Sequence, residues 1–147
     1  MKREIRFRVW DTSLNRMLYN GGLTVSNNEI TDLLGVPMQF TGLKDKNGRD
    51  VFEGDILHIE YFKLAAGEGL GVYEVEAQLT GVVEFDGLSL VLQNIVGEKW
   101  SEYTGYDAGE GKCRFVYLGD VYEGSLDASY QIEVIGNIYE NPELLKP

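Results

Sequence analysis

A mainly β fold with a minor helical part is predicted by three features of this 147-residue chain. Apolar and polar residues alternate along several short runs, glycine-rich turns separate those runs, and helical signals occur in only two short segments. Short alternating strands joined by glycine turns favour a small closed barrel. We therefore expect an N-terminal hairpin and short helix over residues 1–42, followed by a small β-barrel with a final helical turn over residues 43–147.

The N-terminal strand is predicted over residues 4–10, EIRFRVW, where the alternation is strict. One of its faces is expected to be exposed to solvent. Turn-forming residues follow, and the segment 17–19 is the expected hairpin partner. The two faces of the strand consist of Ile5, Phe7 and Val9 on one side, and of Arg6, Arg8 and Trp10 on the other.

A short helix is predicted over residues 26–35, SNNEITDLLG. Ser26 and Glu29 have the spacing of a capping box, in which each side chain bonds the backbone amide of the other residue. Gly35 stands where the C-terminus of a helix often needs a positive φ. Because a helix of about two turns is unstable alone, it must pack against the sheet.

A hairpin is predicted at Asn47-Gly48, since this dipeptide tolerates positive φ at both central positions of a type I′ turn. The lysines and aspartates beside it are then solvated turn residues. Gly54 is expected to relieve the backbone at a second bend, before a strand resumes over residues 56–62. We interpret the whole segment 41–57, TGLKDKNGRDVFEGDIL, as a determinant of the fold and not as a site.

Further strands are predicted in the C-terminal half, with loops over residues 64–71 and 97–112 between them. Gly81 and Gly136 are expected to shift the strand register, and Asp86-Gly87 to form a two-residue hairpin turn. Asn141 is expected to cap a final helical turn that begins at Pro142. The strands cover residues 73–85, 88–92, 113–118 and 130–140, with Val75, Ala77, Leu79, Leu88, Leu90, Leu92, Tyr130, Ile132 and Val134 facing inward.

Composition and charge exclude several classes of protein. No run approaches the roughly 18 apolar residues of a membrane span, and a single cysteine excludes an internal disulfide framework, so we expect a cytoplasmic protein. The formal net charge is −11. Residues 1–17 contain five basic and two acidic residues, whereas residues 53–143 contain 18 acidic and four basic ones, a net charge of −14. Such an acidic surface repels phosphate backbones, so direct nucleic-acid binding is disfavoured.

Catalytic, metal and cofactor sites are not predicted. His58 is the only histidine and lies in a predicted strand, and Cys113 opens an apolar strand. The GEGK sequence at residues 109–112 lacks both the first glycine and the Ser or Thr of a phosphate-binding loop. Acidic pairs such as Glu53 with Asp55, or Glu74 with Glu76, are typical of a solvated strand face. We therefore expect a protein that is not an enzyme.

The long polar loop at residues 97–112 contains the strongest signal for binding. Its large rings, Trp100, Tyr103 and Tyr106, are the candidate protein-interaction surface. Exposed aromatic residues serve as anchors at protein interfaces, but the same rings could pack within the molecule, and the sequence leaves both open.

Three blocks of sequence resemble, in order and spacing, the YopX family of phage and prophage proteins. They are REIRFRVWD with Met17-Leu18, MQFTGLKDKNGRDVFEGDIL, and EVIGNIYENPELL. The resemblance extends from residue 3 to residue 145, although residues 63–130 match only in length and β character. It implies a mainly β architecture with an SH3-like barrel in the C-terminal part, and a phage or prophage gene whose product acts inside the bacterial host. The family is largely uncharacterised, so no catalytic residues carry over.

The leading hypothesis is a non-enzymatic phage accessory protein that binds another host or phage protein, or copies of itself. The basic N-terminal strand and the acidic remainder favour a homo-oligomer. The alternative is an acidic DNA mimic that occupies a host nucleic-acid-binding protein. A metal-dependent enzyme that uses carboxylates is the third and weakest hypothesis.

Overall fold

The computed structural model describes residues 4–64, 73–98, 115–117 and 128–145. Within them the chain is almost entirely β, as predicted, and ends in one 3-10 helix. The strands are β1 (Phe7–Asp11), β2 (Arg16–Leu18), β3 (Leu23–Ser26), β4 (Glu29–Leu33), β5 (Gly35–Lys44), β6 (Asp50–Phe52), β7 (Asp55–Leu64), β8 (Tyr73–Asp86), β9 (Ser89–Glu98), β10 (Phe115–Tyr117) and β11 (Ala128–Asn137), and the helix is η1 (Pro142–Leu145).

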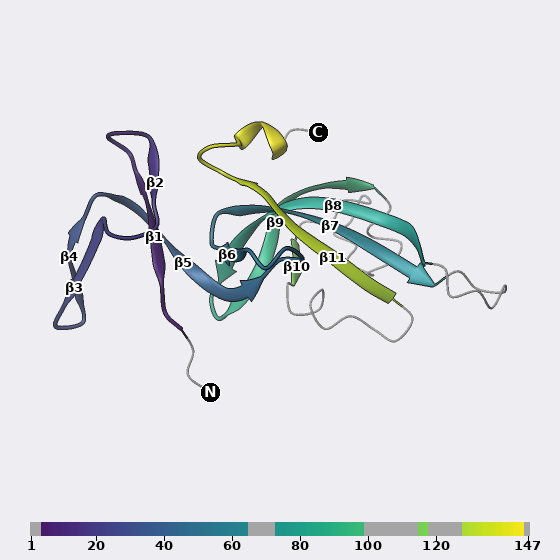
Figure 1. Ribbon diagram of the computed structural model, residues 1–147, viewed down its shortest axis with the longest axis horizontal. Helices are drawn as coiled ribbons and strands as arrows, with labels where there is room; N and C mark the ends of the chain where they lie inside the picture. Colours follow the sequence, from purple (N-terminus) through teal and green to yellow (C-terminus); the bar gives the residue numbers. More distant parts are fainter. Residues whose placement is uncertain (1–3, 65–72, 99–114, 118–127, 146–147) are drawn as a thin grey trace.

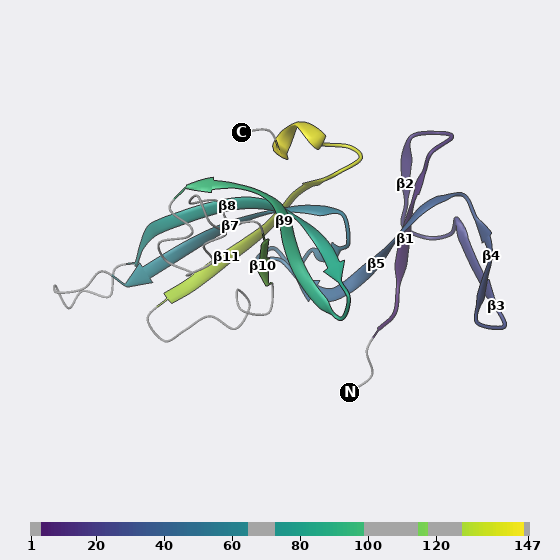
Figure 2. The same cartoon turned by 180° about the vertical axis from the view of Figure 1, so that it is seen from behind.

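The strands form two sheets and a separate hairpin, and all of their pairings are antiparallel (Figure 1). One sheet has the order β2-β1-β5-β6, and the other has the order β10-β9-β8-β7-β11. The second sheet is strongly curled, and the β3–β4 hairpin projects at the opposite end of the molecule (Figures 1 and 2). Strand β5 links the two ends, because its first half pairs with β1 and its second half with β6.

The core lies mainly inside the curled sheet and at its junction with β1, β5 and β6. Ile132 and Val134 of β11 and Leu92 of β9 are buried, as their alternation predicts. The inward direction predicted for Leu88 is wrong, because this side chain is fully exposed. Asp86 pairs with Ser89, so the two-residue loop is Gly87-Leu88 and Leu88 lies at its tip. The positive φ of 60° at Gly87 suits the first central position of a type II′ turn.

The helix predicted over residues 26–35 is wrong, since this segment belongs to a hairpin and to the start of β5. Asn27 and Asn28 have φ values of 52° and 65°, which are the positive angles that a type I′ hairpin turn requires at both central positions. Ser26 pairs directly with Glu29 across that turn. The spacing of a capping box is therefore also the spacing of two residues that flank a two-residue hairpin loop.

The hairpin predicted at Asn47-Gly48 is confirmed, but its turn is not of type I′. Only Gly48 of this pair has a positive φ, at 79°. The amide of Gly48 donates to the carbonyl of Asp45, and the amide of Asp45 donates to the carbonyl of Arg49. A turn followed by one left-handed residue is the usual form of a three-residue hairpin loop.

Asp45 corrects the expectation that the acidic residues of this turn are solvated, because it is 8% exposed. Its Oδ1 accepts hydrogen bonds from the amides of Asn47 and Arg49, both at 2.9 Å, and its Oδ2 accepts one from the amide of Val134 at 3.0 Å. Burial disfavours the charge, but these three hydrogen bonds outweigh it and lower the pKa of Asp45. The carboxylate thus attaches the β5–β6 turn to β11.

Replacing Asp45 with asparagine should lower the free energy of unfolding by about 1.5–3 kcal/mol, because an amide cannot accept bonds on both of its ends. A carboxylate whose pKa is lower in the folded state stabilises the protein above its unfolded pKa, and loses this effect as the pH falls through the folded pKa. The difference between wild type and Asp45→Asn should therefore close below a pH of about 3.9. Urea unfolding from pH 7 to pH 2.5 measures it, and the exposed Asp32→Asn serves as control. A difference that stays constant through pH 2.5 would contradict the role of the charge.

Both predicted register shifts are confirmed. The β8–β9 pairing shifts between Thr80 and Val82, at Gly81, and the β11–β7 pairing shifts between Val134 and Gly136. The helical turn predicted after Pro142 is also present as η1. Asn141 does not cap it with its side chain, since its Oδ1 accepts a hydrogen bond from the amide of Asn137 instead. No helix among the described residues is long and apolar enough to cross a membrane.

Candidate functional site

A buried ion pair joins β1 to the start of β7. Arg8 and Asp55 lie 2.8 Å apart, and each side chain is 2% exposed. Arg8 also donates to the carbonyl of Glu53 at 3.2 Å, and Asp55 accepts from the amide of Phe52 at 2.8 Å. Burial raises the pKa of Asp55, against the opposing effects of the Arg8 charge and the Phe52 amide. The face of β1 that contains Arg8 and Trp10 is thus buried, whereas Ile5 and Phe7 on the other face are exposed, which corrects the simple one-sided prediction.

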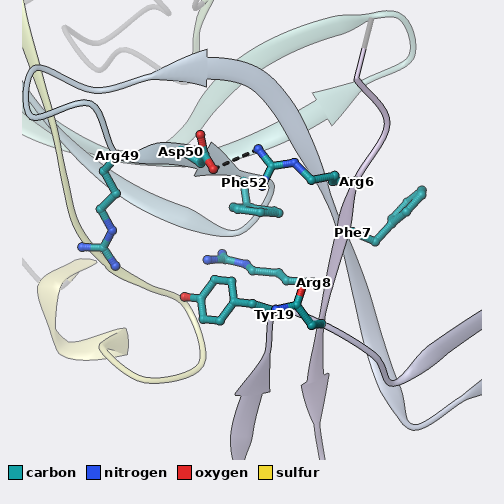
Figure 3. Close-up of a pocket in the computed structure, with 8 residues that line it drawn as sticks. Arg6, Phe7, Arg8, Tyr19, Arg49, Asp50 and Phe52 are labelled. Carbon is teal, nitrogen blue, oxygen red and sulfur yellow. Dashed lines mark hydrogen bonds and ion pairs between the residues drawn. The ribbon is translucent and has the colours of Figure 1, made fainter.

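Aromatic rings position the two arginines of β1 and its N-terminal flank. The guanidinium carbon of Arg8 lies 4.9 Å from the centroid of the Phe52 ring, and that of Arg6 lies 4.2 Å from the centroid of Phe40. Figure 3 shows Phe52 between the two guanidinium groups. Cations over ring faces are attracted by the ring quadrupole, so these contacts help to fix both side chains.

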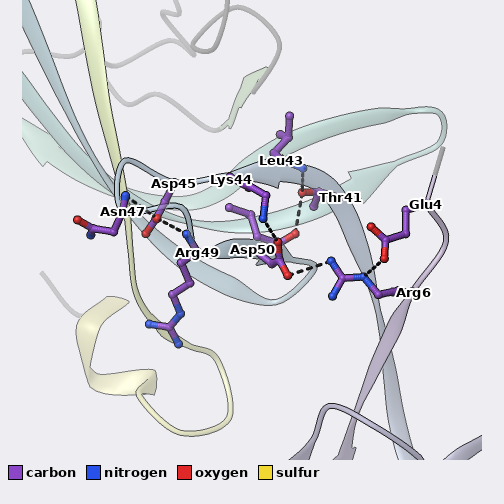
Figure 4. A network of polar contacts seen from close by, with 10 residues as sticks. Glu4, Arg6, Thr41, Leu43, Lys44, Asp45, Asn47, Arg49 and Asp50 are labelled. Atoms are coloured by element: carbon purple, nitrogen blue, oxygen red, sulfur yellow. Dashed lines mark hydrogen bonds and ion pairs between the residues drawn. The ribbon is translucent and has the colours of Figure 1, made fainter. Parts of the chain in front are cut away.

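A surface network of charges surrounds Arg6. Its Nη2 lies 2.9 Å from Asp50 and its Nε lies 2.7 Å from Glu4 (Figure 4). Asp50 also bonds Lys44 at 2.8 Å. The hydrogen bonds from Lys44 and Arg6 lower the pKa of Asp50, so this carboxylate is ionised at neutral pH. The charge of Arg6 is therefore largely balanced.

A pocket of about 390 Å³ opens beside these residues. Its polar lining includes Arg6, Arg8, Arg49 and Asp50, and its aromatic lining includes Tyr19 and Phe52 (Figure 3). Among the described residues, none forms a hydrogen bond or an ion pair with the guanidinium of Arg49. Three cations and one anion thus line a pocket in a chain whose net charge is −11.

The β3–β4 hairpin has one apolar face that is open to solvent. Leu23 pairs with Leu33 and Val25 pairs with Ile30, so these four side chains share one face. Val25 is 56% exposed, Ile30 53% and Leu33 41%. The opposite face is polar, because Thr24 pairs with Asp32 and Ser26 with Glu29.

The candidate surface predicted from the sequence, Trp100, Tyr103 and Tyr106, lies outside the described residues, as do Cys113 and the GEGK segment. His58 is a strand residue, as predicted, and its Nδ1 lies 3.2 Å from the hydroxyl of Thr80. In the described ranges, no group of three or more His, Cys, Asp or Glu side chains could hold a metal ion.

The arginine pocket and the apolar hairpin face were not predicted from the sequence. The pocket has no linear signal, because its residues come from β1, the segment after β2, the β5–β6 turn and β6. The hairpin face did have one, since Val25, Ile30 and Leu33 become neighbours once Asn27-Asn28 is assigned to a type I′ turn.

The curled antiparallel sheet and the projecting hairpin define a small all-β protein with an N-terminal arm. The chain belongs to the YopX protein family, whose model matches residues 26–127 and 110–146. It is also similar to the crystal structure of protein EF1440 from Enterococcus faecalis, with 23% identity over 99% of this chain and 100% of that chain, at a TM-score of 0.45. No curated protein matches the sequence.

Proposed function

We propose that this protein is a non-enzymatic accessory protein of a phage or prophage, that it acts in the cytoplasm of the bacterial host, and that it works by assembling with copies of itself. In this proposal residues 43–147 form an SH3-like barrel that supports the projecting arm. The observation that carries the proposal is the exposed apolar face of the β3–β4 hairpin, with Val25 56% and Ile30 53% exposed.

The physical argument concerns the stability of the hairpin itself. An isolated two-stranded hairpin is marginally stable in water, and it needs a further strand or a packed surface on its apolar face. Complete burial of a Val, Leu or Ile side chain contributes about 1.5–3 kcal/mol. Covering the four apolar residues of this face therefore supplies enough free energy for a specific contact.

A second copy of the chain is the occupant that the charges favour. The hairpin contains Glu29 and Asp32 and no basic residue, whereas three arginines line the pocket of the N-terminal part. The −14 region over residues 53–143 adds to this asymmetry. Opposite charges at two ends of one molecule attract neighbouring copies, and a contact of this head-to-tail kind closes into a ring when its rotation permits.

The test is the molar mass in solution of the wild type and of a variant that combines Val25→Lys with Ile30→Lys. We expect an oligomer for the wild type and a monomer for the variant, because two lysines on this face oppose its burial. The loss of two buried side chains weakens association by at least about 100-fold at 1.4 kcal/mol per tenfold. Light scattering coupled to size exclusion, at low and at high salt, measures the mass.

The matched control combines Thr24→Lys with Ser26→Lys, which adds the same charge to the polar face of the same hairpin. It should keep the mass of the wild type. A wild type that is monomeric at every salt concentration would overturn self-assembly, and equal masses for both variants would place the contact elsewhere. In a separate pull-down, a host nucleic-acid-binding protein that DNA displaces would favour the alternative role as an acidic DNA mimic.

A further inference from the structure

We infer that the arginine pocket binds a small phosphate monoester with a planar ring, a ligand of the size of a mononucleotide. This site is independent of the hairpin face and of self-assembly. It rests on the charges of the pocket, on its unpaired donors, on its aromatic lining and on its volume.

The unpaired donors come from Arg49 and Arg8. Arg49 is exposed and extends from the β5–β6 turn, where its backbone is held by Asp45. Its guanidinium has no polar partner among the described residues. The side chain of Arg8 is 2% exposed, and its Nε has no hydrogen-bond partner in the described part of the chain. A buried donor of this kind is rare in native proteins, and it is characteristic of a site whose acceptor comes from a ligand.

The guanidinium group favours an oxyanion. Its planar fork of N–H donors matches the oxygen atoms of a phosphate, and such charge-assisted bonds are about twice as strong as neutral ones. Asp50 is the only acidic residue that lines the pocket, and Arg6 and Lys44 already compensate its charge. Arg49 therefore offers a net positive charge to a ligand.

The aromatic lining favours a ligand with a flat ring beside the phosphate. Tyr19 is 51% exposed and Phe7 is 37% exposed, and both line the pocket. Figure 3 shows the Tyr19 hydroxyl on the same side of the pocket as the guanidinium groups of Arg8 and Arg49. Stacking on such a ring contributes about 1–3 kcal/mol for a nucleobase.

The volume and the surrounding charge favour a small molecule over a polymer. A pocket of about 390 Å³ lies in the lower part of the range for small-molecule sites, which is about 300–1,000 Å³. A nucleic-acid strand would extend beyond it, onto a chain with a net charge of −11. That charge repels further phosphates.

Isothermal titration calorimetry of the full chain at fixed low salt tests the proposal with three probes: adenosine 5′-monophosphate, inorganic phosphate and adenosine. We expect the monophosphate to bind most tightly, phosphate to bind more weakly, and adenosine not to bind. Arg49→Gln should weaken monophosphate binding at least tenfold. Tyr19→Leu should weaken monophosphate binding and leave phosphate binding unchanged.

The matched control is Arg16→Gln, which removes an exposed arginine of β2 that does not line the pocket and pairs with Asp11. It should bind the monophosphate as the wild type does. Equal losses in Arg16→Gln and Arg49→Gln, binding of adenosine as tight as that of the monophosphate, or no binding of any probe at millimolar concentration would each overturn the proposal. Circular dichroism confirms that each variant is folded.

Discussion

Arg8→Met should lower the free energy of unfolding by about 3–5 kcal/mol at pH 7, because it leaves the buried carboxylate of Asp55 without its partner. The Asp55 side chain is 2% exposed, so water cannot replace the guanidinium. Arg8 also donates to the Glu53 carbonyl and lies over the Phe52 ring, and both contacts are lost with it. Urea unfolding followed by circular dichroism measures the effect.

The pH dependence of Arg8→Met follows from the raised pKa of Asp55. Burial raises this pKa in the wild type, and the variant lacks the arginine that opposes the shift. The folded variant then binds a proton more tightly than the unfolded chain does. Its stability is complete below the unfolded pKa of about 3.9, and it is lost as the pH rises through the folded pKa. The deficit relative to the wild type should therefore be smaller at pH 4 than at pH 7.

The control is the double variant Arg8→Met with Asp55→Asn. The asparagine oxygen can still accept the hydrogen bond from the Phe52 amide, but no uncompensated charge remains. It should be more stable than Arg8→Met alone, because most of the loss in the single variant comes from the stranded charge. If the losses of the two single variants simply add, the side chains are not coupled and the prediction is wrong.

Gly35→Ala should destabilise the protein by about 3 kcal/mol or more, at or beyond the upper end of the effects of overpacking. Gly35 pairs with Asp11 across the β1–β5 ladder. A Cβ atom at this position would overlap the backbone oxygen of Trp10, and a backbone atom cannot move aside as a flexible side chain can. The first residue of β5 should then separate from β1, which disturbs the stack of Trp10 on Tyr139, whose centroids lie 5.2 Å apart. Near-UV circular dichroism and urea unfolding report both effects.

Gly21→Ala is the control for the steric argument. Gly21 has a φ of 104° and no atom within 4 Å of an added Cβ, so only the backbone conformation opposes the substitution. Its cost should be about 1 kcal/mol. A loss as large as that of Gly35→Ala would mean that both glycines act through backbone conformation, which would contradict the overlap with Trp10.

The sequence by itself determined the β class, the hairpin at Asn47-Gly48, and the register shifts at Gly81 and Gly136. These features depend on neighbours along the chain, and alternation and glycine express them directly. The three blocks of resemblance likewise identified the family. Local signals were insufficient at residues 26–29, because Ser-Asn-Asn-Glu satisfies both a capping box and a two-residue hairpin. The left-handed angles at Asn27 and Asn28 decide for the hairpin.

Only the tertiary structure decided which charged residues are buried and where a pocket forms. Arg8 meets Asp55 across 47 positions of sequence, and Asp45 meets Val134 across 89. The pocket brings Arg49 of the β5–β6 turn beside Arg8 of β1 and Tyr19 after β2. An isolated arginine or aspartate is expected at the surface, since burial of an unpaired charge is very costly. Its burial depends on a partner that only folding brings within hydrogen-bonding distance.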